Sequence, residues 1–137
     1  TPNCSSAASD VYKRQELMNG LSGLAGFHKI QSIETTEALA ELPEQGICIN
    51  ATSLGLKAED PLPLDLTLMP AEWSVYDMVY NPKETQLTKQ ATEQNRMQST
   101  GLGMLVHQGA RAFELWSEKK VDALIMEQAA EKALEIK

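Results

Sequence analysis

The sequence predicts an α/β fold in which helices flank a parallel sheet. Short apolar runs that suit strands alternate with segments whose apolar residues recur every three or four positions. Helices of this length between strands are typical of right-handed βαβ units, whose strands run parallel. Polar or glycine-containing segments follow the strands, and ligands collect at the carboxyl edges of such sheets. The pattern therefore also predicts a ligand-binding edge.

Length and composition narrow the functional classes. The 137 residues suffice for one domain, at roughly 100–200 residues each. The formal charge is −7, from 12 basic and 19 acidic side chains, which disfavours a general nucleic-acid surface because phosphates need basic partners. No apolar run reaches the about 18 residues that would cross a bilayer, and two cysteines cannot build a disulfide scaffold. We expect a cytoplasmic protein without nucleic-acid or membrane partners.

Residues 1–15 are expected to lie outside the folded domain. They show no apolar periodicity, and Ser9–Gln15 resembles the translation of a transposase-end adapter used to prepare sequencing libraries. A disordered native tail is the alternative. In both cases the fold is expected to occupy residues 16–137.

Four elements are expected before residue 51. A short helix fits residues 16–24, and the alternating segment 30–33 fits a strand. Residues 34–42 carry apolar side chains at helical spacing, behind a threonine N-cap and ahead of Pro43, so they predict a helix. The continuous apolar run Ile47–Asn50 is typical of a strand that is covered on both faces.

The second half of the chain predicts a loop and five further elements. Three prolines exclude regular structure from much of residues 51–70. Residues 74–80 fit a strand, and residues 85–94 fit a helix with Leu87 and Ala91 on its inner face. The remaining expected elements are a strand at 96–99 and helices at 103–117 and 122–136.

Two of the segments that follow strands carry polar candidates. In Asn50–Leu56, amide and hydroxyl side chains could bind a ribose, a phosphate or a carboxamide, or could instead satisfy the backbone of a polar turn. In Tyr80–Thr85, the Tyr80 hydroxyl could donate to a substrate, or its ring could pack at the sheet edge while Thr85 caps the next helix. The residues alone leave both interpretations open.

A third segment runs from Gly101 into a helix. Glycines there allow a flat ring or a backbone to approach closely. Gln108 is the only polar side chain in a line with Met104, Ala112 and Leu115, and if buried it must find partners in a polyhydroxylated ligand, in water or in a neighbouring helix. An apolar seam along the same helix comprises Leu102, Val106, Gly109, Phe113 and Trp116.

A metal site is not expected. The two histidines, His28 and His107, lie in different predicted elements, and neither has a cysteine or carboxylate at ligand spacing. Both are expected to be solvated.

These motifs, in this order, resemble the C-terminal half of shikimate dehydrogenase. The resemblance runs from about Glu16 to the end of the chain, with Phe113–Trp116 after its three densest segments: Asn50–Leu56, Val75–Pro82 and Gly101–Gln108. It implies a partial Rossmann-like sheet in a truncated NADP-binding domain, whose C-terminal helices would pack toward a missing substrate domain. The implied reaction is the NADPH-dependent reduction of 3-dehydroshikimate to shikimate, on the route to chorismate and the aromatic amino acids.

The resemblance implies roles for individual residues. Four would contact NADP: Thr52 and Ser53 beside the cofactor, Met78 packed on the nicotinamide, and the backbone of Gly101 near the carboxamide. Tyr80 and Gln108 would hydrogen-bond the hydroxyls or the carboxylate of shikimate. Asp77 and Asn81 are expected to be structural.

Several features of the family are not found in these 137 residues. They include the N-terminal domain, whose Lys and Asp handle the proton, the glycine-rich phosphate loop, and the Asn-Arg-Thr stretch that selects the 2′-phosphate. We therefore expect no catalytic residue within the chain and no turnover by the chain alone. The strands that would separate segments 30–33 and 47–50 are not found either, so Ile47–Asn50 is expected to form a bare apolar edge that aggregates or pairs elsewhere.

Two other functions remain as alternatives. A quinate/shikimate dehydrogenase that uses NAD would share the same motifs, because the NADP-selective stretch is not found. A catalytically silent binding or regulatory module would keep the ligand-binding edge without the chemistry.

Overall fold

The computed structural model of the chain describes residues 13, 15–21, 33 and 35–135. The chain divides into two compact units, Thr1–Leu39 and Ala40–Lys137. In the first unit residues 15–21 are helical, in agreement with the predicted helix at 16–24 over the part described. Most of the predicted strand at 30–33 lies outside the described residues, and Ile33 itself is not in a strand.

The helix predicted at 34–42 is shorter than expected. Helix α2 (Glu37–Ala40) is four residues long, and bends or turns occupy residues 35–36 and 41–42. Of its four side chains only Leu39 is buried. A helix this short depends on tertiary packing for its stability. Because Leu39 is its one buried side chain, the packing stabilises only a single helical turn.

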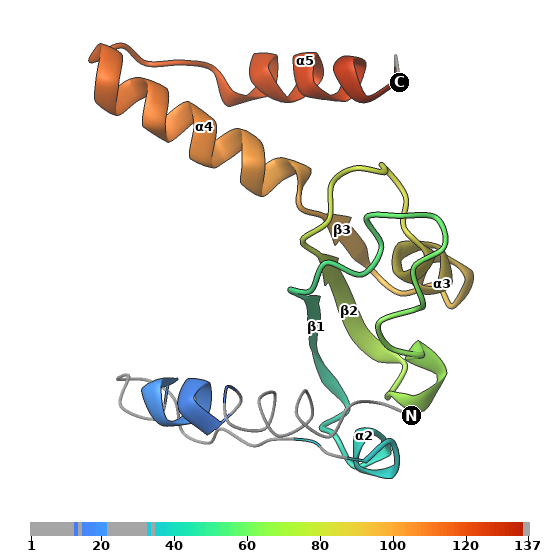
Figure 1. Cartoon of the computed structure of the whole chain (residues 1–137). Helices are drawn as coiled ribbons and strands as arrows, with labels where there is room; N and C mark the ends of the chain where they lie inside the picture. The colour runs from blue at the N-terminus through green and yellow to red at the C-terminus, as the bar shows by residue number, and fades with distance from the viewer. Residues whose placement is uncertain (1–12, 14, 22–32, 34, 136–137) are drawn as a thin grey trace. The chain divides into compact units, whose positions relative to one another are not determined.

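The second unit contains a three-stranded parallel sheet in the order β1–β2–β3 (Figure 1). Its strands are β1 (Gln45–Asn50), β2 (Glu72–Asp77) and β3 (Gln98–Thr100). The register places Asn50 opposite Asp77 and Asp77 opposite Thr100, so all three strands end together at their carboxyl edge. The predicted α/β fold with a parallel sheet is confirmed; the first of these strands ends at Asn50 as predicted, and the other strand ends differ from the prediction by one to three residues.

One face of the sheet carries the core. Helix α3 (Gln86–Glu93) packs there against β2 and β3, and the 3₁₀ turn η1 (Leu66–Leu68) packs against α3, which begins at its N-cap Thr85 as predicted. Thr85 and Thr88 form a capping box, in which each hydroxyl accepts a hydrogen bond from the other residue's backbone N–H. The buried apolar residues include Leu66, Met69, Val75, Val79, Leu87 and Ala91. Leu87 and Ala91 therefore occupy the inner face that the sequence predicted.

The opposite face of β1 is open, which corrects the expectation of a strand covered on both faces. Ile47 and Ile49 are 63% and 59% exposed. They alternate with half-buried Cys48, whose neighbour across the register is the buried Val75. Burial on the sheet lies on the face of Val75, so β1, whose apolar run suits two covered faces, is covered on only one. β1 is also an edge strand of the described sheet, as expected.

Helix α4 (Leu102–Ser117) leaves the carboxyl end of β3, and helix α5 (Ala123–Glu135) packs along it (Figure 1). Leu102, Val106 and Ala110 are buried, but Phe113 and Trp116 are exposed. The predicted apolar seam is therefore buried at Leu102 and Val106 and exposed at the C-terminal end of α4. Among the described residues, no helix has the length and apolar character needed to cross a membrane.

Candidate functional site

A hydrogen-bonded cluster ties together the carboxyl ends of β1 and β2. At its centre lies Asp77, whose side chain is completely buried. Its Oδ1 accepts a hydrogen bond from Asn50 Nδ2 at 2.9 Å and another from the backbone N–H of Val79 at 3.1 Å. Its Oδ2 accepts a hydrogen bond from the Thr85 hydroxyl at 2.7 Å. Asp77 therefore joins the ends of two strands to the N-terminus of α3, in keeping with the structural role expected for it.

Asn50 organises the turn that follows β1. Its Nδ2 also donates to the carbonyl of Leu54 at 3.0 Å, and its Oδ1 accepts from the Thr52 hydroxyl at 2.7 Å. The Thr52 hydroxyl in turn accepts from the backbone N–H of Leu54 at 3.1 Å. Asn50 and Thr52 thus make the hydrogen bonds of a polar turn, and the contact of Thr52 with a cofactor stays a prediction. The side chain of Ser53 is exposed at the same turn.

Met78 and Gly101 meet at the carboxyl edge. The backbone N–H of Met78 donates to the carbonyl of Asn50 at 3.0 Å, and the N–H of Gly101 donates to the carbonyl of Val79 at 3.4 Å. A Cβ atom on Gly101 would overlap the Met78 carbonyl and lie 2.8 Å from its carbon. Glycine at this position therefore allows the two backbones to approach closely, because a Cβ atom would extend into the Met78 carbonyl. The Met78 side chain is 37% exposed.

Tyr80 and Gln108 are both at the surface. Tyr80 is 40% exposed and stands just before the cis Asn81–Pro82 peptide bond. Gln108 is exposed on α4, about 10 Å along the helix axis from Gly101 at 1.5 Å per residue. The amide of Gln108 thus faces solvent and needs no buried partner. That these two side chains meet over one ligand stays a prediction.

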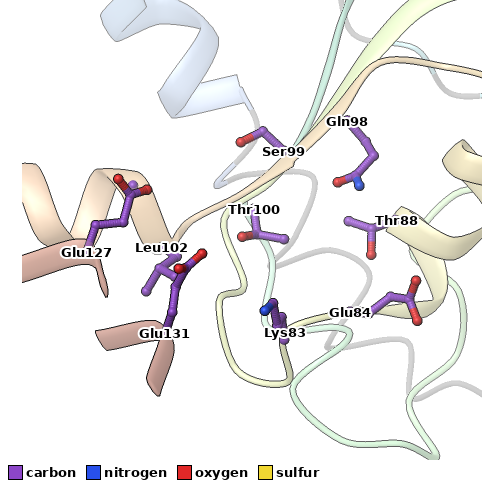
Figure 2. A pocket seen from close by; sticks show the side chains of 10 residues that line it. Lys83, Glu84, Thr88, Gln98, Ser99, Thr100, Leu102, Glu127 and Glu131 are labelled. Carbon is purple, nitrogen blue, oxygen red and sulfur yellow. The ribbon is translucent and has the colours of Figure 1, made fainter. Parts of the chain in front are cut away.

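Two cavities adjoin Glu84, in the segment that leads into α3. The larger, of about 600 Å³, opens between the end of β3, the start of α3 and helix α5 (Figure 2). It is lined by Lys83, Glu84, Thr88, Gln98, Ser99, Thr100, Leu102, Gly103, Glu127 and Glu131. The second, of about 480 Å³, adjoins Gly55, Asn81 and Lys89. Neither cavity is lined by any of the six predicted binding residues.

The larger cavity could not be predicted from the sequence, because the residues that line it come from distant parts of the chain. Figure 2 shows Glu127 and Glu131 of α5 on one side and Thr88 of α3 on the other. No local spacing connects them. The cavity holds three carboxylates and one ammonium group among its lining side chains, so it disfavours anions.

Other chemistry-bearing side chains of the described part are few. No group of three His, Cys, Asp or Glu residues there could hold a metal ion. His107 is exposed, and His28 lies outside the described residues. Burial raises the pKa of the Cys48 thiol, an effect that Asp77 reinforces and Arg96 opposes.

Comparison with known proteins relates this geometry to one family. The family model described as the shikimate 5'-dehydrogenase C-terminal domain matches residues 101–131. A shikimate dehydrogenase (NADP(+)) of Rhodopseudomonas palustris strain BisB5 is 44% identical over 101 residues, which are 74% of this chain and 35% of that protein. In sequence and in fold, this chain is similar to the C-terminal part of shikimate dehydrogenases.

Solved shikimate dehydrogenases share the fold described above. The enzyme from Thermus thermophilus, in complex with NADP(H) and shikimate, has a TM-score of 0.62 and 36% identity over 74% of this chain and 38% of its own. A quinate dehydrogenase from Corynebacterium glutamicum in complex with NAD has a TM-score of 0.56 and 30% identity over 60% of this chain and 29% of its own. The chain spans about a third of the length of the curated relatives it matches.

Proposed function

We propose that this chain provides the nicotinamide-contacting edge, and part of the substrate-contacting surface, of a shikimate dehydrogenase. The complete enzyme would reduce 3-dehydroshikimate to shikimate with NADPH. Thr52, Ser53, Met78 and Gly101 are the proposed cofactor contacts. Tyr80 and Gln108 are the proposed substrate contacts, which bind and orient the cyclic polyol. No catalytic residue is assigned within the chain.

One observation carries the proposal. Three adjacent parallel strands end in register, and the loops that follow them are joined through Asn50, Met78 and Gly101 by backbone contacts. The carboxyl edge of a parallel sheet is where such folds bind dinucleotides. The exposed side chain of Met78 lies at this junction and offers a polarizable apolar surface for a flat ring. Similarity to the Thermus thermophilus enzyme, solved with NADP(H) and shikimate, supports the choice of ligands.

A hybrid enzyme tests the whole proposal. The matched segment of the Rhodopseudomonas palustris relative, 35% of that protein, would be replaced by the corresponding segment of this chain. We expect the purified hybrid to oxidise NADPH in the presence of 3-dehydroshikimate. Activity with quinate and NAD alone would instead favour the alternative substrate and cofactor. A folded hybrid that is inactive with both pairs would contradict the proposal.

Variants of the hybrid separate the two proposed substrate contacts from general stability. Tyr80→Phe and Gln108→Ala are each expected to raise the KM for 3-dehydroshikimate by about tenfold, because each removes a hydrogen bond to the substrate. His107→Ala, an exposed neighbour of Gln108 on α4, is the matched control and should leave the KM unchanged. The 137-residue chain by itself is expected to show no turnover, and NADPH oxidation by the purified chain would refute that expectation.

A further inference from the structure

We propose that Asp77 is a positioning residue, which holds the loops after β1 and β2 in the arrangement that the nicotinamide contacts require. This inference rests on the proposed function of the carboxyl edge and adds to it a buried residue that contacts neither cofactor nor substrate. Asp77 is the last residue of β2 and is completely buried. Its carboxylate joins the end of β1, 27 residues earlier, to the backbone just after β2 and to the N-terminus of α3.

All three partners of Asp77 are donors. They are the Asn50 amide, the backbone N–H of Val79 and the hydroxyl of Thr85, at 2.9, 3.1 and 2.7 Å. A carboxylate only accepts hydrogen bonds, so this surrounding suits it, and no other side chain of this size offers two oxygens for three converging donors. Such a fully satisfied buried network specifies one arrangement of the segments it joins.

The network determines the position of Met78 from both sides. The residue before Met78 is Asp77 itself, and the residue after it, Val79, donates its backbone N–H to Asp77. Met78 donates its own N–H to the carbonyl of Asn50. Because Asp77 and Val79 both point into the core, the Met78 side chain is directed outward, where it is 37% exposed. The proposed nicotinamide contact thus depends on a carboxylate that lies behind it.

The same carboxylate acts on Thr52 through Asn50. Asp77 accepts from the Nδ2 of Asn50, which orients that amide so that its Oδ1 faces the turn. The Oδ1 then accepts hydrogen bonds from the backbone N–H and the hydroxyl of Thr52, at 3.1 and 2.7 Å. Without Asp77 the Asn50 amide is held only by its hydrogen bond to the Leu54 carbonyl, and the two hydrogen bonds from Thr52 to the Asn50 Oδ1 are weakened together.

The two oxygens of Asp77 allow a graded test. In Asp77→Asn the retained oxygen can still accept from Asn50 and Val79, and only the bond from Thr85 is lost. In Asp77→Ala all three donors lose their acceptor. Leu87→Ala is the matched control, because Leu87 is a buried core residue of α3 with no part in the network.

The first readout is hydrogen exchange in the 137-residue chain, followed by mass spectrometry on peptides that contain Thr52 and Val79. Asp77→Ala should accelerate exchange in these peptides by at least about tenfold. Asp77→Asn should keep them close to wild type. Leu87→Ala should accelerate them only as far as its loss of overall stability explains. Equal acceleration by Asp77→Ala and Leu87→Ala, at equal stability, would overturn the inference.

The second readout is the KM for NADPH of the hybrid enzyme carrying the same substitutions. Asp77→Ala should raise this KM by about tenfold, and Asp77→Asn and Leu87→Ala should change it by less than about threefold. Equal KM values for Asp77→Ala and Leu87→Ala would overturn the role in cofactor binding. If the unsubstituted hybrid is inactive, the proposed function fails, and the exchange result still decides whether Asp77 holds the two loops.

Discussion

At Gly101 the start of α4 lies against the carbonyl of Met78, and a Cβ atom would overlap that carbonyl. The backbone angles of Gly101, φ −70° and ψ −2°, are accessible to alanine, so any penalty must come from the contact. We expect Gly101→Ala to lower the free energy of unfolding by about 1–3 kcal/mol, as other overpacked sites do. Urea unfolding followed by circular dichroism measures this loss.

Gly103 supplies the control for that substitution. It lies in the first turn of the same helix, and a Cβ atom built there meets nothing within 4 Å. Gly103→Ala should therefore raise the free energy of unfolding by about 0.5–1 kcal/mol through helix propensity. If both substitutions stabilise the chain equally, the close approach of Gly101 to Met78 is wrong.

The Cys48 thiol gives a prediction on pH dependence. Burial raises its pKa, so at any pH below the raised value a smaller fraction is thiolate than in the unfolded chain. Because the thiolate is the nucleophile, alkylation of Cys48 by iodoacetamide at about pH 8 should be slower in the native chain than in urea. The difference should narrow as the pH rises. Peptide mass spectrometry distinguishes Cys48 from Cys4, and equal rates in the two conditions would contradict the prediction.

Residues with local partners were the ones that sequence could place. The capping role of Thr85 and the polar turn at Asn50 and Thr52 both depend on neighbours within four residues. Gln108 shows the limit, because its helical position was predictable but its exposure was not. The exposure of Gln108 depends on which segments cover α4, and no local pattern contains that information.

At the scale of elements, Arg96 fastens the start of β2 to the 3₁₀ turn η1. Its Nη2 donates to the carbonyls of Leu66 and Met69 at 2.8 and 3.1 Å, and its Nη1 donates to that of Pro70 at 2.6 Å. The side chain is buried, and its remaining hydrogen bonds go to the Gln94 amide oxygen and the Trp73 carbonyl. The guanidinium thus supplies a charged donor to the carbonyls at the end of a short turn, where those of Leu66 and Pro70 otherwise accept only from the backbone N–H groups of Met69 and Trp73.

We expect Arg96→Ala to lower the free energy of unfolding by about 3 kcal/mol, since several buried carbonyls lose a charged donor together. Arg96→Lys should recover less than half of this loss, because one ammonium cannot reach carbonyls on both sides as a planar fork does. Thermal and urea unfolding measure both variants. Arg111→Ala is the control, because the exposed ion pair of Arg111 with Glu114 is worth at most about 1 kcal/mol. If Arg96→Ala lowers the free energy of unfolding no more than Arg111→Ala does, the stabilising role of the Arg96 hydrogen bonds is wrong.

Elements differed in how well their own sequence defined them. Helix α3 was predictable almost to the residue, since it has a threonine cap and two apolar positions four residues apart. The strand predicted at 96–99 is β3, but it begins two residues later and ends one residue later, because Gln98, Ser99 and Thr100 are polar and enter the sheet through their backbone pairing with β2. The carbonyls that Arg96 binds lie 23 to 30 residues away in the sequence, so no local pattern could predict that Arg96 joins η1 to β2.

At the scale of the whole molecule, the continuous apolar run of β1 predicted a covering layer on each side of the sheet, and only one is described. Ile47 and Ile49 share the open face and lie on an edge strand. An exposed apolar edge strand is a template for pairing with another chain. The residues alone thus predicted the sheet and its exposed edge, but they could not show which face α3 would cover.

We therefore expect the 137-residue chain to self-associate through β1, with a sedimentation coefficient that rises with protein concentration. Ile49→Lys should reduce this association by at least about tenfold in the association constant, because it places a charge on the open face of the edge strand. Met97→Lys is the control: Met97 is 80% exposed outside the strands, and the substitution changes the net charge of −7 by the same single unit. If Ile49→Lys and Met97→Lys reduce the association constant equally, the reduction comes from the added charge alone and not from its place on β1. A chain that sediments as a monomer at every concentration would show that the open face of β1 is tolerated in solution.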